Sequence, residues 1–270
     1  MERSFVRLIR GALASCYSPR QSSKVLAMQV EETKELEHDK IDVYEAPSYR
    51  AAEAARILVI PPSTVNAWCF GQGYTTKEGD LRTFQPVIRP ADYRRRLLSF
   101  ANLCELHVLS SITRSYRIPL QQVRPALQYV REQLGIERPL LERDFQTNGI
   151  SLFLTYAGQL INVSRGGQVA LRGDLEAALD RIERGGAAGR PIRLFPFSRP
   201  IAKAAEQPRI IAIDPQIGFG RPIVVPARVR TEVIIDRFEA GDSPSEMAAD
   251  YGVTEAEILE AVRFEYRLAA

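Results

Sequence analysis

The chain has 270 residues, of which 45% are hydrophobic and 26% are charged, and its formal net charge at pH 7 is +3. These values are typical of folded globular proteins, and the length suits two or three domains. Three widely spaced cysteines and two histidines exclude a disulfide framework, a zinc-ligand spacing and a histidine-rich metal site. The chain contains no run of about 18 apolar residues, so no membrane span is predicted. The composition fits a reducing cytoplasm.

Residues 1–45 have the character of an extension to the folded part of the chain. The stretch MERSFVRLIRGALASCYSPRQSS is basic and has an apolar face, which raises the alternative of a targeting peptide. It lacks the continuous apolar segment of a secretory signal, and Met28 offers an internal start. We therefore expect residues 1–45 to be a loosely ordered or mis-annotated extension.

Residues 48–68, SYRAAEAARILVIPPSTVNAW, predict two short helices joined by a tight turn. Ser48 is the expected cap of the first helix, and small side chains at helical spacing let a second helix approach closely. Prolines are tolerated in the first turn of a helix, so Ser63–Trp68 is the predicted second helix. Its Val65 and Trp68 share a face and would pack on the first helix. The apolar stripe of that first helix comprises Ala51, Ala54, Ala55 and Leu58.

The polar side chains of the second helix point away from the packed face. Their short tips can reach base edges or phosphates, which favours a DNA-binding helix-turn-helix. A helical hairpin that never contacts DNA is the alternative. The predicted DNA-binding residues are Arg50, Ser63, Thr64, Asn66, Lys77 and Arg82.

This stretch resembles the helix-turn-helix of the MerR family. The residues in register with the family pattern are Tyr49, Glu53, Ala54, Ala55, Leu58, Ile60, Ser63, Thr64 and Trp68. The turn glycine of that family is Val59 here. A β-branched residue at positive φ costs about 1 kcal/mol or more. Either the turn has another geometry, or Val59 is strained.

The glycine-punctuated segment after Trp68 predicts a hairpin that would form the wing of a winged helix-turn-helix. Lys77 and Arg82 are predicted to contact phosphates, together with the run Arg94 to Arg96. For these three arginines the alternative is the solvated start of a helix. Residues 46–100 carry eight basic and four acidic side chains. This part of the chain can therefore meet a polyanion.

The middle of the chain, residues 91–205, predicts both helices and strands. One amphipathic helix begins at Asp92 and a second follows Pro119 and ends at Gly135; they serve either dimerisation or core packing. Residues 150–171 are rich in β-branched and aromatic residues and predict two or three short antiparallel strands. A short helix over Leu175–Ile182 and a strand over Pro191–Pro196 follow. The acidic residues of the helical run are interspersed with arginines, as on a solvated face, so we expect no catalytic site there.

Residues 206–270 predict a separate domain that begins with a short β-hairpin. Ile210–Ile213 and Ile223–Val225 are its expected strands, joined by a glycine-rich turn. Ser243 and Thr254 are natural caps for the helices that follow. The three predicted helices are Thr231–Ala240, Ser243–Tyr251 and Thr254–Leu268.

The last two helices align with the first helix-turn-helix, but their charge differs. Residues 231–270 carry ten acidic and three basic side chains, and the helix that would enter a groove carries Glu255, Glu257 and Glu260. Carboxylates a few ångströms from phosphates are repelled by about 1 kcal/mol each even in water. This unit therefore predicts contact with a protein partner or with a second copy of the chain.

The same unit resembles a family catalogued as a domain of unknown function and often described as VapB-like antitoxins. The matching residues are Asp214, Pro215, Ile217, Gly220, Pro222, Ile223, Arg228, Val229, Gly241, Ser243, Glu246, Ala248 and Tyr251. The Gly-Thr of the family pattern is replaced by Pro226-Ala227. The resemblance implies a PIN-like ribonuclease toxin as partner, with Arg228 and Arg230 at the toxin's acidic metal site. Pairing of these arginines with carboxylates of their own domain is the alternative.

The predicted fold class is α+β and mainly helical. It combines an N-terminal winged helix-turn-helix, a small middle unit with antiparallel strands, and a C-terminal three-helix helix-turn-helix domain with a short β-hairpin. The predicted units are residues 1–45, 46–90, 91–205 and 206–270.

With the two resemblances, the sequence predicts a DNA-binding antitoxin that represses its own operon. It would bind double-stranded operator DNA as a homodimer and neutralise a PIN-like ribonuclease toxin. We expect no enzymatic activity, no metal or cofactor, and no membrane association. A stand-alone MerR-like regulator that senses a ligand through the middle region is the alternative. An adaptor that never contacts DNA is a third class.

Overall fold

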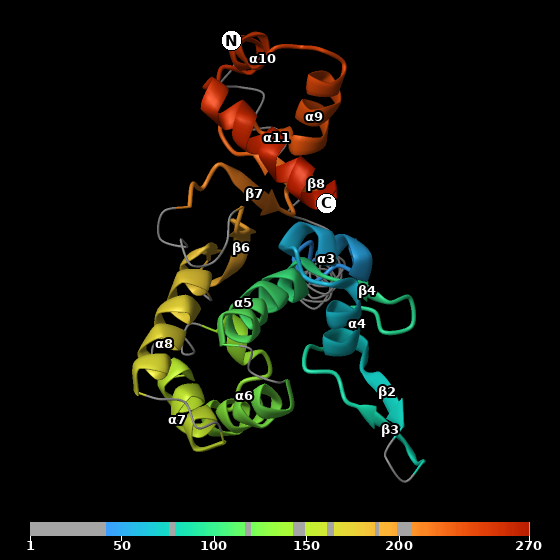
Figure 1. The fold of residues 1–270 in the computed structure, drawn as a ribbon, viewed down its shortest axis with the longest axis vertical. Helices are drawn as coiled ribbons and strands as arrows, with labels where there is room; N and C mark the ends of the chain where they lie inside the picture. Colours follow the sequence, from blue (N-terminus) through green and yellow to red (C-terminus); the bar gives the residue numbers. More distant parts are fainter. Residues whose placement is uncertain are drawn as a thin grey trace, which may run out of the picture. The chain divides into compact units, whose positions relative to one another are not determined.

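The computed structural model describes residues 42–75, 79–116, 120–142, 149–160, 165–186, 189–198 and 207–269. From Val43 onward these residues belong to one compact unit. The prediction of an extension over residues 1–45 falls mainly on residues 1–41, outside the described residues. The described elements confirm an α+β fold that is mainly helical (Figure 1).

Two short helices and an antiparallel hairpin begin the described chain, as the sequence predicts (Figure 1). A short strand before the first helix pairs with a strand that follows the hairpin, with Tyr49 opposite Leu98. In the hairpin, Tyr74 lies opposite Arg82. The elements are β1 (Tyr49–Arg50), α3 (Ala51–Leu58), α4 (Pro62–Phe70), β2 (Gln72–Thr75), β3 (Leu81–Phe84) and β4 (Leu97–Leu98).

Ser48 does not cap the first helix, and that prediction is wrong. The residue before α3 is Arg50, whose side chain makes no capping hydrogen bond. The backbone N–H of Ser48 instead donates to the carbonyl of Leu98 at 2.9 Å, and its hydroxyl donates to the carbonyl of Ala46 at 3.1 Å. The pairing of β1 with β4 therefore delays the start of the helix by two residues.

Two long helices follow, α5 (Phe100–Tyr116) and α6 (Leu120–Leu134). The second matches the prediction, and Gly135 ends it at a φ of 66°. The first begins later than Asp92, because the Asp92 carboxylate accepts the backbone N–H of Arg95 at 2.8 Å and shapes a turn. A 3₁₀ turn, η1 (Pro139–Leu141), completes this part.

The strands predicted over residues 150–171 are wrong, because helices α7 (Ile150–Leu160) and α8 (Arg165–Asp180) occupy the described residues of this stretch. Ile150, Phe153 and Leu154 are buried at spacings of three and four residues, which is the period of a helix. The β-branched and aromatic residues fit the helical face because burial outweighs their β propensity. The helix predicted over Leu175–Ile182 is the end of α8 up to Asp180, and Ile182 already belongs to the strand that follows.

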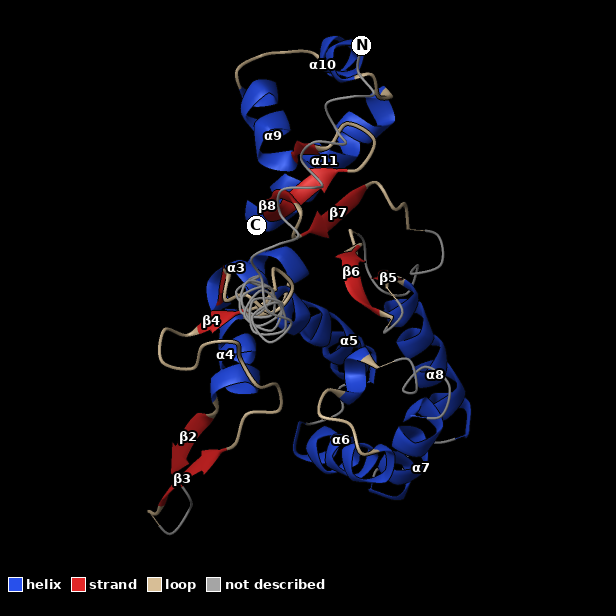
Figure 2. Cartoon of the chain, turned by 180° about the vertical axis from the view of Figure 1, so that it is seen from behind, coloured by secondary structure: helices blue, strands red, loops and turns tan. Residues whose placement is uncertain are grey.

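One antiparallel sheet runs through the second half of the chain, in the order β5-β6-β7-β8-β9 (Figure 2). The strand predicted over Pro191–Pro196 and both strands of the predicted hairpin belong to this sheet. It pairs Leu194 with Ile213, so strands from both sides of the predicted boundary at residue 206 share it. Its strands are β5 (Ile182–Gly185), β6 (Arg190–Leu194), β7 (Ile211–Asp214), β8 (Ile217–Val224) and β9 (Val229–Arg230).

Helices α9 (Thr231–Glu239), α10 (Pro244–Tyr251) and α11 (Glu255–Ala269) lie close to where the sequence places helices. Ser243 caps α10 through a capping box with Glu246. Thr254 caps α11 in the same manner, since its hydroxyl accepts the N–H of Glu257 at 3.3 Å. The buried side chains of α10 and α11 cluster with Ile211 and Val224 of the sheet.

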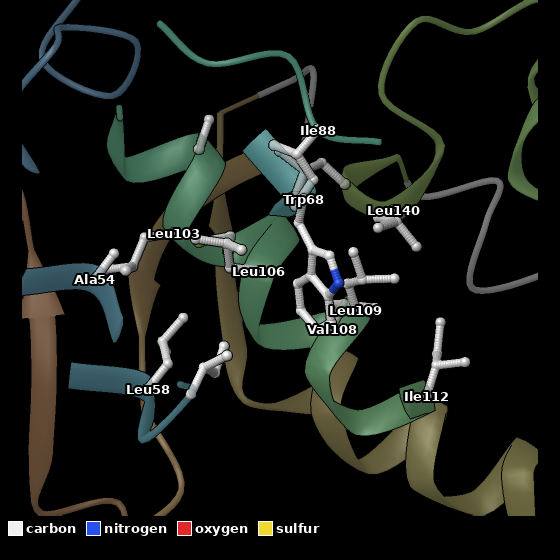
Figure 3. Packing of buried hydrophobic residues seen from close by; sticks show 14 of the residues in the cluster. Ala54, Leu58, Trp68, Ile88, Leu103, Leu106, Val108, Leu109, Ile112 and Leu140 are labelled. Carbon is white, nitrogen blue, oxygen red and sulfur yellow. The ribbon is translucent and has the colours of Figure 1, made fainter. Parts of the chain in front are cut away.

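A large apolar core joins the helix-turn-helix to α5 (Figure 3). Trp68, with only 5% of its surface exposed, stands beside Val108 and Leu109 of α5. The backbone carbonyl of Trp68 also accepts the N–H groups of Val87 and Ile88, at 2.8 and 3.0 Å. The single tryptophan therefore fixes α4 against both α5 and the segment that follows the hairpin.

Polar contacts hold α3 against the sheet. The buried Tyr49 hydroxyl donates to the carbonyl of Gly220 at 2.9 Å. Burial raises the pKa of this phenol, so it stays neutral and can donate. Glu53 forms an ion pair with Arg221 of β8, and Arg56 lies 3.5 Å from Glu265 of α11. Two residues of the MerR-like pattern, Tyr49 and Glu53, thus act here as docking groups.

The close approach of Tyr49 to Gly220 yields a stability prediction. Gly220 and Gly252 have similar φ values, 72° and 65°, but only at Gly220 would a new Cβ meet an atom, the Tyr49 hydroxyl oxygen at 2.3 Å. We expect Gly252→Ala to cost about 1 kcal/mol of unfolding free energy through backbone strain. Gly220→Ala should cost about 1–3 kcal/mol more, because of overpacking. Urea unfolding of both variants measures the difference.

Tyr49→Phe serves as the control for this pair. Alone it should cost about 1 kcal/mol, for one buried hydrogen bond. Combined with Gly220→Ala it should relieve the closest contact and leave only the ring carbon Cζ at 3.2 Å, so the double variant should be more stable than the sum of the single effects implies. Equal losses in the two alanine variants, with no coupling to Tyr49→Phe, would show that the contact is unimportant.

Candidate nucleic-acid interface

The turn between α3 and α4 keeps the geometry of a helix-turn-helix at the cost of strain. Val59 ends α3 in the left-handed region, with φ 52° and ψ 48°. Its N–H donates to the carbonyl of Arg56 at 3.1 Å, and the N–H of Ile60 donates to that of Ala55 at 2.9 Å. The position therefore demands the conformation that glycine adopts most easily. Of the two outcomes that the sequence left open, the structure shows the strained one.

The packed and exposed faces of α4 divide as predicted. Val65 and Trp68 are buried, Ser63 is exposed, and Thr64 and Asn66 are partly exposed. The helix contains no acidic side chain. Its outer face can therefore approach phosphates without carboxylate repulsion.

Among the described residues that were predicted to contact DNA, the structure brings one pair together, Asn66 and Arg96. The amide nitrogen of Asn66 donates to the carbonyl of Pro62 at 2.8 Å, and its oxygen accepts from Nη2 of Arg96 at 2.5 Å. Arg96 also stacks its guanidinium over the Phe70 ring, 4.3 Å from the centroid. Asn66 thus positions Arg96 beside α4, and a base contact by Asn66 would require its amide to exchange these partners.

Arg96 holds this place through an unusual backbone conformation, with φ at 56°. Sequence reasoning grouped it with Arg94 and Arg95 as a basic run and could not single it out. Asp92 and Leu97 exchange two backbone hydrogen bonds, at 3.0 and 2.9 Å, and Arg96 takes up the left-handed region in the tight turn that they close. The acceptor on Asn66 lies 30 residues away in sequence.

The other predicted DNA-binding residues are placed less completely. Arg50 is exposed directly before α3. The backbone of Arg82 lies in β3, opposite Tyr74. Lys77 lies outside the described residues. Arg94 is exposed, whereas Arg95 lies 3.8 Å from its own Asp92.

The acidic rear helix differs in part from its prediction. Glu260 does not face outward: it is 2% exposed and pairs with Arg263. The Glu257 carboxylate accepts the backbone N–H of Thr254 and so takes part in the cap of α11. Glu255 is exposed and remains available to a partner. The prediction that three carboxylates would confront a ligand is therefore wrong for Glu260, because the helix turns that residue into the core.

The two predicted partner-binding arginines have different environments. Arg230 lies 3.3 Å from Glu232, which matches the alternative that it pairs within its own domain. Arg228 is exposed and adopts a φ of 55°. A non-glycine residue in that region is strained by about 1 kcal/mol or more, and such strain concentrates at functional positions.

Three further features of the described residues concern metal ligands, thiols and helix hydrophobicity. In that part of the chain, no group of three or more His, Cys, Asp or Glu side chains is arranged to hold a metal ion. Cys69 and Cys104 are buried, and burial raises the pKa of both thiols, so neither is a reactive nucleophile. None of the described helices is both long and apolar enough to cross a membrane.

Two family models match separate parts of the chain. Residues 47–127 match a "Putative DNA-binding HTH domain". Residues 211–264 match a "Protein of unknown function (DUF433)". The first match covers α3, α4 and the hairpin, which form the candidate interface, and extends through α5 into α6.

Longer similarities extend to proteins of Mycobacterium tuberculosis strain H37Rv. A protein named "Putative antitoxin VapB45" is 25% identical over 239 residues, which cover 81% of this chain and 94% of that relative. "Uncharacterized protein Rv2308" is 26% identical over 237 residues, covering 82% of this chain and 92% of that protein. The crystal structure of Rv2018 from M. tuberculosis superposes with a TM-score of 0.57 at 22% identity, covering 81% of this chain and 98% of that one. This last likeness supports the fold.

The strained turn gives a prediction with a built-in control. Val59 is 38% exposed, and Val59→Ala and Val59→Gly both remove its isopropyl group. Only the glycine variant also relieves the strain of the left-handed backbone. The Val59→Gly variant should be more stable than Val59→Ala by about 1 kcal/mol, measured by urea unfolding. If alanine proves equal to glycine, the strain assigned to Val59 is absent.

Proposed function

We propose that this chain is the DNA-binding antitoxin of a type II toxin–antitoxin pair, which represses its own operon and neutralises a PIN-like ribonuclease toxin. The observation that carries the proposal is the outer face of α4, which is polar, free of acidic residues and bordered by Arg96. The match to a DNA-binding helix-turn-helix model over the same elements supports it, as does the similarity to a VapB-type antitoxin.

In this proposal α4 enters the major groove of operator DNA, as the second helix of a MerR-like helix-turn-helix. Ser63, Thr64 and Asn66 contact base edges, and the β2–β3 hairpin acts as the wing. Arg50, Arg82 and Lys77 contact phosphates, which position the protein without reading sequence. A homodimer on a two-fold symmetric operator would present two such helices to successive major grooves.

The toxin contact belongs, in this proposal, to the rear of the chain. Residues 231–270 carry ten acidic and three basic side chains, which suits a basic, RNA-binding partner. Arg228 is exposed and backbone-strained, so it is the better candidate of the two arginines to enter an acidic site on the toxin. Arg230 would first have to leave Glu232. The chain itself performs no catalysis in this scheme.

The DNA contact is tested by the double variant Asn66→Ala and Lys77→Ala. Loss of a base contact should weaken binding to the chain's own promoter about tenfold or more. Loss of one phosphate contact should reduce the slope of log affinity against log salt by about 0.9. Fluorescence anisotropy with a promoter fragment over a salt series measures both.

The matched control is Gln128→Ala with Arg172→Ala, which removes an exposed amide on α6 and a partly exposed cation on α8. Neither residue belongs to the predicted interface, so affinity and salt slope should stay at the wild-type values. Unchanged promoter affinity in the Asn66 and Lys77 variant would overturn the site assignment.

The toxin contact is tested by co-expression of the chain with the other open reading frames of its operon. We expect a second polypeptide to co-purify, to degrade RNA when it is separated, and to lose that activity when the chain is added back. Arg228→Glu should weaken the complex about tenfold or more, whereas Arg172→Glu should not, because only the first places a carboxylate at the proposed acidic site. A chain that purifies alone from its native operon would contradict the antitoxin proposal.

A further inference from the structure

A cavity of about 760 Å³ is lined by the segment that follows the hairpin and by residues of α5 and α6. One wall is the segment that follows the hairpin and carries Arg89 and Tyr93, and the opposite wall is formed by Arg131 of α6 and Arg138 before η1. Glu105 of α5 also borders it. The volume is in the range of small-molecule sites in proteins, which is about 300–1,000 Å³.

A buried carboxyl group and a shared arginine mark the charged side of the cavity. Glu105 is 6% exposed, accepts from the Asn102 amide at 3.0 Å, and lies 3.6 Å from Nη1 of Arg138. The other nitrogen of Arg138, Nη2, lies 3.0 Å from Glu45. Burial raises the pKa of Glu105 to about 7, with Arg138 and Asn102 opposing the shift. At neutral pH this carboxyl group can therefore donate a hydrogen bond for part of the time.

The lining holds three arginines and three glutamates, but not every arginine is paired with a carboxylate. Within the described residues, no carboxylate lies at ion-pair distance from Arg89 or Arg131, and Arg131 uses only its Nε, toward the carbonyl of Glu137. Nη1 of Arg138 is buried and forms no hydrogen bond with the protein. Its nearest carboxylate, Glu105, lies 3.6 Å away, which is beyond hydrogen-bond distance. An anionic acceptor placed closer would supply the hydrogen bond that this nitrogen lacks.

Apart from Glu137, the rest of the lining is apolar. Pro86, Val87 and Pro90 border the cavity together with the half-exposed ring of Tyr93. An occupant that satisfies both sides would carry a carboxylate for the arginines and an apolar or aromatic body for the prolines and the tyrosine. Arginine recognises a carboxylate through two parallel hydrogen bonds, and the apolar lining favours an anion that carries an organic body.

We propose that this cavity is a binding site for a small organic acid, with Arg89, Arg131 and Arg138 as its carboxylate-recognising residues. The site is distinct from the DNA and toxin contacts proposed above. Its ligand would touch the segment whose N–H groups, at Val87 and Ile88, bond to the carbonyl of Trp68 in α4. Asn102 links the same segment to Glu105, since its amide donates both to the Arg89 carbonyl, at 2.8 Å, and to the Glu105 carboxylate.

Isothermal titration of the full chain with benzoate, phenylacetate and indole-3-acetate tests the proposal, with benzyl alcohol as the neutral counterpart of benzoate. We expect at least one of the three acids to bind once per chain and benzyl alcohol to bind at least tenfold more weakly. Arg89→Ala should reduce the affinity about tenfold or more, for one charge-assisted hydrogen bond. Arg172→Ala, which removes a cation elsewhere, should leave it unchanged. Absence of binding by all three acids, or equal affinity in Arg89→Ala, would overturn the proposal.

The pH dependence separates this site from a nonspecific basic patch. Glu105 faces Glu45, Arg131 and Arg138, while Arg89 and Glu137 also border the cavity. As pH rises through about 7, Glu105 loses its proton and repels an incoming carboxylate, so affinity for the acid should fall. Glu105→Gln mimics the protonated form and should abolish this fall while keeping binding. A pH profile identical in wild type and Glu105→Gln would contradict the role of the cavity. Both experiments omit DNA, so their outcome is independent of the proposed repression.

Discussion

The buried indole of Trp68 is the contact on which the rest of the arrangement depends. Its ring packs on α5, and its backbone carbonyl receives two N–H groups from the segment that follows the hairpin. The orientation of α4, the exit of the hairpin and one wall of the cavity are therefore set by one residue. A helix-turn-helix of 20 residues has too few contacts to be rigid alone, so a large buried aromatic side chain at its end supplies the missing apolar area.

The front of the chain is not an independent module in this structure. Tyr49 and Glu53 attach α3 to β8, and Arg56 reaches Glu265 of α11. These contacts lie on β1 and α3, and none of them uses the outer face of α4. Both helices are therefore bound to the body of the protein, α4 through Trp68, while the outer face of α4 is available to a ligand.

Local sequence rules predicted the parts of the fold that local chemistry controls. The proline-started helix α4, the glycine that ends α6 and the cap at Ser243 all follow from backbone preferences of single residues. The failures have nonlocal causes. Helices α7 and α8 replaced the predicted strands because burial of one helical face outweighed β propensity, and Ser48 lost its capping role to strand pairing with Leu98. The Asn66–Arg96 pair and the burial of Glu260 likewise depend on how distant elements meet.

The central claim is that α4 and the hairpin, rather than the acidic rear helices, contact DNA. Hydrogen–deuterium exchange of the full chain, with and without a fragment of its own promoter, measures this contact residue by residue. The account predicts that DNA slows exchange in α4 and in strands β2 and β3, and leaves α10 and α11 unchanged. Slower exchange in α11 with none in α4 would contradict it.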